Sequence, residues 1–137
     1  MAEQKRILIG EDDQTILRMT KLRLEHEGYD VLVADSSEEV LRQVGADPSA
    51  RPVHLILLDV KMPTLNGYAI CRELRRTPTT AGIPIIIFSA SEPELQHLAN
   101  HCIEVGATDW IKKPFRAKDL LAKVHRALRD GEGGGNG

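Results

Sequence analysis

Short apolar runs alternate along the chain with longer segments in which apolar residues recur at helical spacing. Five apolar runs predict β-strands, at residues 7–9, 29–34, 54–59, 83–88 and 109–112. Segments with helical periodicity follow them, at about residues 15–27, 38–44, 67–75, 92–105 and 117–129. Such alternation is typical of a parallel sheet with right-handed crossovers and helices on both faces. We therefore expect an α/β fold. The second strand is more mixed in character than the others, so we expect it near an edge of the sheet.

The third apolar run, residues 54–59, ends on a carboxylate, Asp59. A continuous run of branched apolar residues is typical of a strand buried on both faces. Pro63 stops its extension, and Asn66–Gly67 supplies a turn before the next helical segment. Asp59 is therefore predicted at the carboxyl end of a parallel strand, where open α/β sheets bind their ligands. Asp59 could instead only cap the next helix, but Asn66 is better placed for that role.

Composition and charge favour a single-domain protein that binds neither nucleic acid nor membranes. The chain has 137 residues, enough for one domain with a full core, and its formal net charge of −2 argues against direct nucleic-acid binding. Cys71 and Cys102 lack metal-binding spacing and are expected to be buried, reduced thiols. The chain shows no signal peptide and no membrane span, so we expect a cytoplasmic protein without membrane association. The domain should occupy residues 5–129, followed by a flexible glycine-rich tail at 130–137.

Chemically active side chains follow other predicted strands as well. Four of them stand at strand ends: Glu11, Asp12, Ser89 and Lys113. Because the carboxyl ends of parallel strands meet at one edge of a sheet, we expect these side chains to converge on Asp59. Asp35 follows the second strand, where a helix-capping role is favoured.

A cluster of three carboxylates needs compensating charge. Two carboxylates about 5 Å apart repel by roughly 3 kcal/mol at an effective dielectric constant near 20. One Mg²⁺ and the Lys113 ammonium would neutralise the three acids, and Mg²⁺ prefers oxygen ligands together with phosphate. These residues predict an aspartate nucleophile that accepts a phosphoryl group, with the Ser89 hydroxyl bonding one of its oxygens.

Four segments, ILIGEDD, LILLDVKMP with NGY after it, IPIIIFSAS and GATDWIKKPF, resemble the receiver domain of bacterial two-component response regulators. The resemblance covers about residues 5–129, and the order and spacing of the segments make it specific. It implies a flavodoxin-like (βα)5 fold, a doubly wound parallel five-stranded sheet with strand order 2-1-3-4-5, similar to the chemotaxis response regulator. In that order the first and third strands are neighbours.

The resemblance also implies roles for the residues at the strand ends. Asp59 would be the phosphoacceptor, charged by the phosphohistidine of a sensor histidine kinase or histidine phosphotransfer protein. The implied metal ligands are Asp12 directly, Glu11 through bound water, Asp59, and the backbone carbonyl of Lys61. The expected protein is a stand-alone phosphorylation switch rather than a turnover enzyme.

Further residues are implied to transmit the signal. Ser89 would move toward the phosphoryl group. Lys113 would stabilise the phosphoryl group, and its peptide bond to Pro114 would be cis. Trp110 would be the switch aromatic, a position at which Tyr or Phe is commoner. The implied output surface is the fourth helix, fifth strand and fifth helix, which would control a protein target. Lys61 and Ser91 stand at positions that tune the lifetime of the acyl phosphate in this family.

Other interpretations remain open. A phosphatase of the haloacid dehalogenase type also uses an aspartate nucleophile, Mg²⁺ and a lysine, but is expected to carry a second acid where Lys61 stands. A degenerate receiver would bind partners without phosphorylation, but this sequence has the expected residues at all the acidic, hydroxyl and lysine positions of the site. His97 and His101 share a helical face and could bind zinc, but a solvated or partner-docking face is favoured. The chain is expected to be a monomer or weak homodimer, with charged contacts available from Asp109, Asp119 and Lys123.

Overall fold

The computed structural model describes residues 4–44, 52–62, 66–89 and 104–132. Its five strands are β1 (Arg6–Gly10), β2 (Asp30–Ala34), β3 (Leu55–Asp59), β4 (Ile85–Ser89) and β5 (Asp109–Lys112). The helices within the described residues are α1 (Gln14–His26), α2 (Ser37–Val44), α3 (Gly67–Arg76) and α5 (Ala117–Glu132). The helix expected at residues 92–105 lies almost entirely outside the described residues; Glu104 and Val105 are helical.

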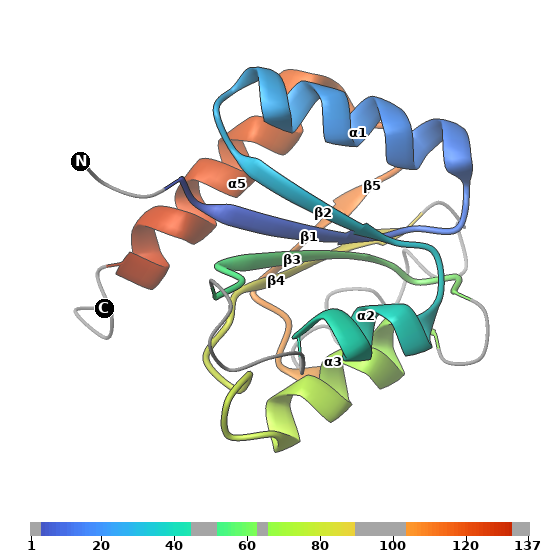
Figure 1. The fold of residues 1–137 in the computed structure, drawn as a ribbon, viewed down its shortest axis with the longest axis vertical. Coiled ribbons are helices and arrows are strands. Elements are labelled where there is room, and N and C mark those ends of the chain that lie inside the picture. The colour runs from blue at the N-terminus through green and yellow to red at the C-terminus, as the bar shows by residue number, and fades with distance from the viewer. Residues whose placement is uncertain (1–3, 45–51, 63–65, 90–103, 133–137) are drawn as a thin grey trace.

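The strands form one parallel sheet in the order β2-β1-β3-β4-β5 (Figure 1). This confirms the predicted α/β architecture and the strand order that the resemblance implied. It also confirms the prediction that β2, the most mixed strand in sequence, lies at an edge. α1 and α5 cover one face of the sheet, and α2 and α3 cover the other (Figure 1).

Alternation along the strands divides the core into two layers. In β3, Leu55 and Leu57 belong to the cluster under α1 and α5, whereas Ile56 and Leu58 belong to the cluster under α2 and α3. All five residues of β3 are buried, as its unbroken apolar run predicted. Each fully buried Leu or Ile contributes about 1.5–3 kcal/mol of hydrophobic stabilisation, so β3 anchors both layers and holds Asp59 on a rigid element.

The buried face of α1 differs from the predicted one. Sequence periodicity placed Ile16, Met19, Leu22 and Leu24 on one side, but the residues that α1 buries are Leu17, Thr20 and Leu24. Met19 is 66% exposed and Leu22 is 58% exposed. The helix carries two apolar stripes, and only the position of the sheet and α5 decides which one is covered. The prediction was therefore wrong for the face that remains open to solvent.

Local signals at the start of α3 agree with the structure. The Asn66 side-chain oxygen accepts a hydrogen bond from the Ala69 N–H at 2.9 Å, which is the N-cap role expected of it. Asp59 is therefore not the cap of α3.

Within α3, Cys71 is buried, and burial raises the pKa of its thiol to about 11, so the thiol stays protonated at neutral pH. Cys102 lies outside the described residues.

Among the described residues, no helix is long and apolar enough to cross a membrane. The glycine-rich tail was predicted at residues 130–137, but α5 continues to Glu132, beyond the expected boundary at residue 129. Residues 133–137 lie outside the described residues.

Candidate functional site

Three carboxylates converge where β1 and β3 end. Gly10 of β1 pairs with Leu58 of β3, so the residues that follow the two strands lie side by side. Glu11, Asp12 and Asp59 each place a carboxylate oxygen within 4.8 Å of the others. Glu11 is fully buried, Asp59 is 6% exposed and Asp12 is open to solvent. The structure therefore brings together the three acids that the sequence singled out.

Lys113 reaches this cluster from the end of β5, the edge strand of the sheet. β5 is separated from β3 by β4, yet the Lys113 Nζ lies 2.5 Å from a Glu11 carboxylate oxygen and 3.2 Å from an Asp59 oxygen. Its ammonium also lies 6.0 Å from the centre of the Phe88 ring. The Lys113–Pro114 peptide bond is cis, as the resemblance implied. The length of a lysine side chain is what allows a residue two strands away to contact the acids.

The cluster is short of positive charge. Burial and the neighbouring Asp59 side chain together raise the pKa of Glu11 to about 7, although Lys113 acts in the opposite direction. Burial alone would lower the pKa of Lys113, but Glu11 and Asp59 raise it above its usual value. Lys113 is thus firmly cationic, and one ammonium does not compensate three carboxylates.

These residues fit a hard divalent cation. All three donors are carboxylate oxygens, the ligand type that Mg²⁺ prefers, and Asp12 is open to solvent. Burial and Asp59 raise the pKa of Glu11 even though Lys113 contacts it, so a second cation would further stabilise the ionised cluster. Glu11 is held in position, since its carboxylate accepts hydrogen bonds from Lys113 and from the Asp13 N–H at 3.3 Å.

The remaining predicted site residues are Lys61, Ser89 and Trp110. Lys61 lies two residues after Asp59 with an exposed side chain. Ser89 is the last residue of β4 and pairs in register with Lys112, but its side chain is outside the part of the chain that is described. Trp110 is 37% exposed on β5, whereas its neighbour Ile111 is buried in the core.

Several other residues singled out from the sequence lie outside the cluster or outside the described residues. Asp35 is exposed after β2 and does not join the acidic cluster, among the residues described. Ser91, and the His97 and His101 of the zinc alternative, lie outside the described residues. Lys123 contacts Asp109 within the same chain at 2.9 Å, rather than leaving both free for contacts between chains.

Gly67 is a site residue whose importance the sequence did not reveal. Its N–H donates a hydrogen bond to the Val60 carbonyl at 2.8 Å. A Cβ at this position would lie 2.4 Å from the Asp59 carbonyl oxygen, which is far inside van der Waals contact. The Asn66–Gly67 pair predicted a turn, but the close approach to the backbone of Asp59 depends on how α3 packs behind β3.

Comparison with known proteins places this geometry in a family. Residues 7–125 match the family model described as the response regulator receiver domain. Over 124 residues the chain is 39% identical to the response regulator ArlR of Staphylococcus saprophyticus, covering 90% of this chain and 52% of that protein. Over 128 residues it is 34% identical to the alkaline phosphatase synthesis transcriptional regulatory protein PhoP of Bacillus subtilis, covering 93% of this chain and 50% of that protein. The chain therefore spans about half the length of these curated relatives.

Solved structures agree with the sequence matches. A putative response regulator from Chloroflexus aurantiacus superposes with a TM-score of 0.83 at 31% identity, covering 93% of this chain and 99% of that one. A CheY-like receiver domain protein from Methanospirillum hungatei superposes with a TM-score of 0.82 at 30% identity, covering 97% of this chain and 100% of that one. Sequence, fold and strand order agree, and the chain belongs to the response regulator receiver domain family.

Proposed function

We propose that this chain is a phosphorylation switch in a two-component phosphorelay, with Asp59 as the phosphoacceptor. Receiver domains are phosphoacceptors that interact with histidine kinases or phosphotransfer proteins, and such a protein is the proposed donor here. The observation that carries the proposal is the position of Asp59, which contacts Lys113 and shares its edge of the sheet with Glu11 and Asp12. The domain is proposed to occupy residues 5–129.

The proposed reaction is transfer of a phosphoryl group from a histidine nitrogen to Asp59. A carboxylate oxygen of Asp59 attacks phosphorus, the N–P bond breaks, and the histidine nitrogen keeps the electron pair. Lys113, 3.2 Å from Asp59, is placed to bind a phosphoryl oxygen after transfer. Mg²⁺, when bound, would neutralise charge on the phosphoryl oxygens.

The proposed roles of the other residues follow the same arrangement. Asp12 is exposed and suits a direct metal ligand, whereas the buried Glu11 suits a residue that holds metal-bound water. The Lys61 backbone carbonyl, two residues after Asp59, is the proposed further ligand. Because the acyl phosphate stays on the protein, the product is one phosphorylated chain, and hydrolysis restores the starting state.

The proposed output is a change in protein binding at the surface formed by β5, α5 and the helix expected at residues 92–105. Ser89 ends β4 next to β5, and Trp110 lies within β5. In the proposed switch, Ser89 bonds the phosphoryl group and Trp110 responds to its movement. The relatives ArlR and PhoP carry names of response and transcriptional regulators, and their additional length lies beyond the part that matches.

Acetyl phosphate and Mg²⁺ test the proposal directly. Intact-mass measurement should show one phosphoryl adduct per chain, and chelation of the metal should slow its formation at least about a hundredfold, because a bound metal supplies several kcal/mol of charge stabilisation. Parallel incubation with p-nitrophenyl phosphate should release no more product than a protein-free blank. Sustained turnover of that substrate would instead support the phosphatase alternative, and adduct formation unaffected by chelation would contradict the metal role.

The open side of α1 is the proposed docking site for the phosphohistidine donor. A groove of about 460 Å³ is lined by Ile16, Met19, Lys113 and Phe115, and another of about 550 Å³ continues along α1 past Leu22. The first groove shares Lys113 with the acidic cluster, so a donor helix seated there would hold its phosphohistidine close to Asp59. Two exposed apolar side chains beside these grooves are the chemistry that a helical partner buries.

Substitution of Met19 and Leu22 by glutamate should slow transfer from a phosphohistidine donor. Each change removes an apolar contact and adds a charge, so transfer is expected to fall on the order of tenfold for each side chain. Phosphorylation by acetyl phosphate should be unchanged, because that small donor needs no protein surface. Arg18→Glu, an exposed change on the same helix, is the control. Equal loss with both donors would show damage to the site rather than to docking.

A further inference from the structure

Phe88 is an aromatic residue near the end of an otherwise aliphatic stretch of β4. The three residues before it, Ile85–Ile87, are isoleucines, and all four side chains are fully buried. Isoleucine fills the earlier buried positions of the strand, so burial alone does not require a ring at this one. The register places Phe88 between Asp59 of β3 and Ile111 of β5, at the edge of the sheet that carries the acidic cluster.

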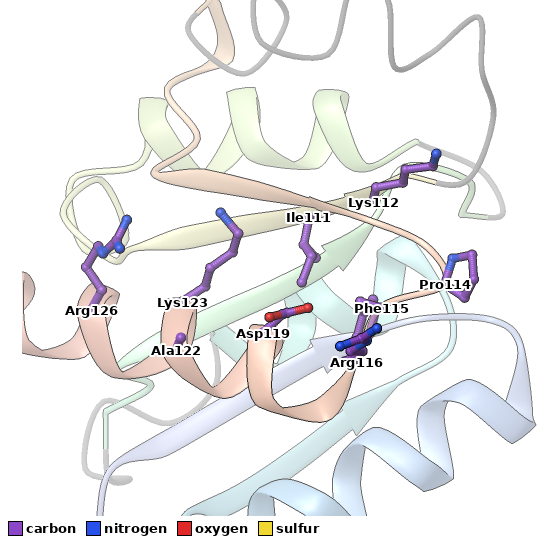
Figure 2. Close-up of a pocket in the computed structure, with 9 residues that line it drawn as sticks. All are labelled: Ile111, Lys112, Pro114, Phe115, Arg116, Asp119, Ala122, Lys123 and Arg126. Carbon is purple, nitrogen blue, oxygen red and sulfur yellow. The ribbon is translucent and has the colours of Figure 1, made fainter.

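Phe88 shares one face of the sheet with Lys113. Phe88 belongs to the core cluster under α1 and α5, as does Ile111, two residues before Lys113. Side chains two residues apart along a strand lie on the same face, and Figure 2 shows Ile111 pointing from β5 toward α5 while Lys112 points away from it. β3, which ends at Asp59, flanks β4 on the other side. Phe88 therefore lies between the strands that supply the lysine and the proposed phosphoacceptor.

The Lys113 ammonium lies over the Phe88 ring as well as against two carboxylates. Its Nζ is 6.0 Å from the centre of the ring, 2.5 Å from a Glu11 oxygen and 3.2 Å from an Asp59 oxygen. The Lys113 side chain is 11% exposed and Phe88 is fully buried, so the contact is largely desolvated. A cation within about 6 Å of an aromatic face is attracted by the ring quadrupole, and the attraction grows as both groups lose water.

A second ring packs against the first. The centre of the Phe115 ring lies 5.1 Å from that of Phe88, with the two planes at 45°, a tilted arrangement that aromatic pairs favour. Lys113 and Phe115 flank Pro114 in the sequence, so the residues on both sides of this proline contact Phe88. The Phe88 ring consequently links the segment after β5 to the strand beside Asp59.

Lys113 has space to turn away from the cluster. A groove of about 460 Å³ borders it, and a lysine carries its ammonium on a flexible four-carbon stem. During the proposed transfer, phosphoryl oxygens would compete with the carboxylates for the ammonium, whereas the ring contact needs no exchange of partners. We infer that Phe88 is a positioning residue for phosphoryl transfer to Asp59, because its ring holds the Lys113 ammonium where it can bind the phosphoryl oxygens. This inference rests on the proposed function.

Fluorinated phenylalanines at position 88 test the inference, because fluorine weakens the attraction of a ring face for a cation while changing the size of the ring little. Mono-, di- and trifluorophenylalanine replace Phe88 in the full chain. The rate of adduct formation from acetyl phosphate and Mg²⁺ should fall with each added fluorine, by about three- to tenfold for the trifluoro variant. The midpoint of urea denaturation should stay at the wild-type value, since the apolar packing is retained.

Labelling of Lys113 by acetic anhydride, followed by peptide mass mapping, reads the ring contact without any phosphoryl transfer. Labelling of Lys113 relative to its exposed neighbour Lys112 should rise with each fluorine, because the ammonium then spends more time outside the cluster. The control compares Tyr29→Phe with trifluorophenylalanine at the same position. These two variants should have equal rates and equal Lys113 labelling, since the Tyr29 ring contacts that of His125, with 6.0 Å between their centres.

Each contrary result removes a different part of the inference. Lys113 labelling that does not respond to fluorine would overturn the ring contact, and labelling that rises while the rate stays constant would overturn the positioning role. An equal response at positions 29 and 88 would overturn both. If the wild-type chain forms no adduct, the proposed function and the role in transfer fail together, whereas fluorine-dependent labelling would still uphold the contact between Phe88 and Lys113.

Discussion

Replacing Asp59 with asparagine is expected to abolish formation of the acyl phosphate. Asparagine has nearly the same shape as aspartate, so the end of β3 and its contacts should survive, but the amide is not a nucleophile toward phosphorus at neutral pH. Intact mass after treatment with acetyl phosphate and Mg²⁺ should show no adduct within the time that saturates the wild type. This is the largest functional effect predicted for any single substitution in the chain.

The matched control is Asp35→Asn. Asp35 also follows a strand at the carboxyl edge of the sheet, but it is exposed and lies outside the acidic cluster of the described residues. Its substitution makes the same chemical change and should leave phosphorylation at the wild-type rate. An adduct of equal yield in the Asp59 variant would move the acceptor to another carboxylate, and peptide mapping would then identify Asp12 or Glu11.

Gly67→Ala is expected to destabilise the chain by about 3 kcal/mol, toward the upper end of the usual cost of overpacking. The new methyl group would lie 2.4 Å from the Asp59 carbonyl oxygen and 3.1 Å from the Val60 Cα. Both atoms belong to the backbone, so no side-chain rotation relieves the contact. Either α3 moves away from β3 or the end of β3 shifts, and both changes disturb the position of Asp59. Urea denaturation measures the loss, and the rate of phosphorylation by acetyl phosphate should fall with it.

Gly82→Ala is the control for this change. A Cβ at Gly82 meets nothing within 4 Å, and its backbone does not have a positive φ. The substitution should leave stability within about 1 kcal/mol of the wild type, on the stabilising side, because alanine restricts the unfolded chain. If the two variants had the same stability, the close packing of α3 against the Asp59 backbone would be disproved.

The acidic cluster shows why stability and function oppose each other here. Burying Glu11 beside Asp59 is costly without a metal, as the raised pKa of Glu11 indicates. Lys113 offsets part of that cost through its contacts with both carboxylates. The same shortage of positive charge would favour binding of a divalent cation, which the proposed phosphoryl transfer requires. We interpret the strained electrostatics as a property of the proposed function rather than of the fold.

Much of the architecture could be predicted from the sequence because its signals are local. An apolar run with a carboxylate at its end identified β3 and Asp59, and the alternation of strands and helices indicated a parallel sheet. A parallel sheet aligns its carboxyl ends, so the convergence of Glu11, Asp12 and Lys113 on Asp59 followed from the order of the elements. The roles proposed for these residues come from the family and await the experiments above.

Other features depended on which elements pack together. The sequence of α1 contains two apolar stripes, and only its contact with the sheet and α5 decided that Leu17 is buried while Met19 is exposed. The fit of Gly67 against the Asp59 backbone and the pairing of Lys123 with Asp109 likewise join residues on different elements. The sequence by itself determined the elements, their order and the chemistry at their ends, because hydrophobic periodicity acts between near neighbours. Only the tertiary structure decided which faces stay open and which groups meet, because those outcomes depend on distances between segments far apart in the chain.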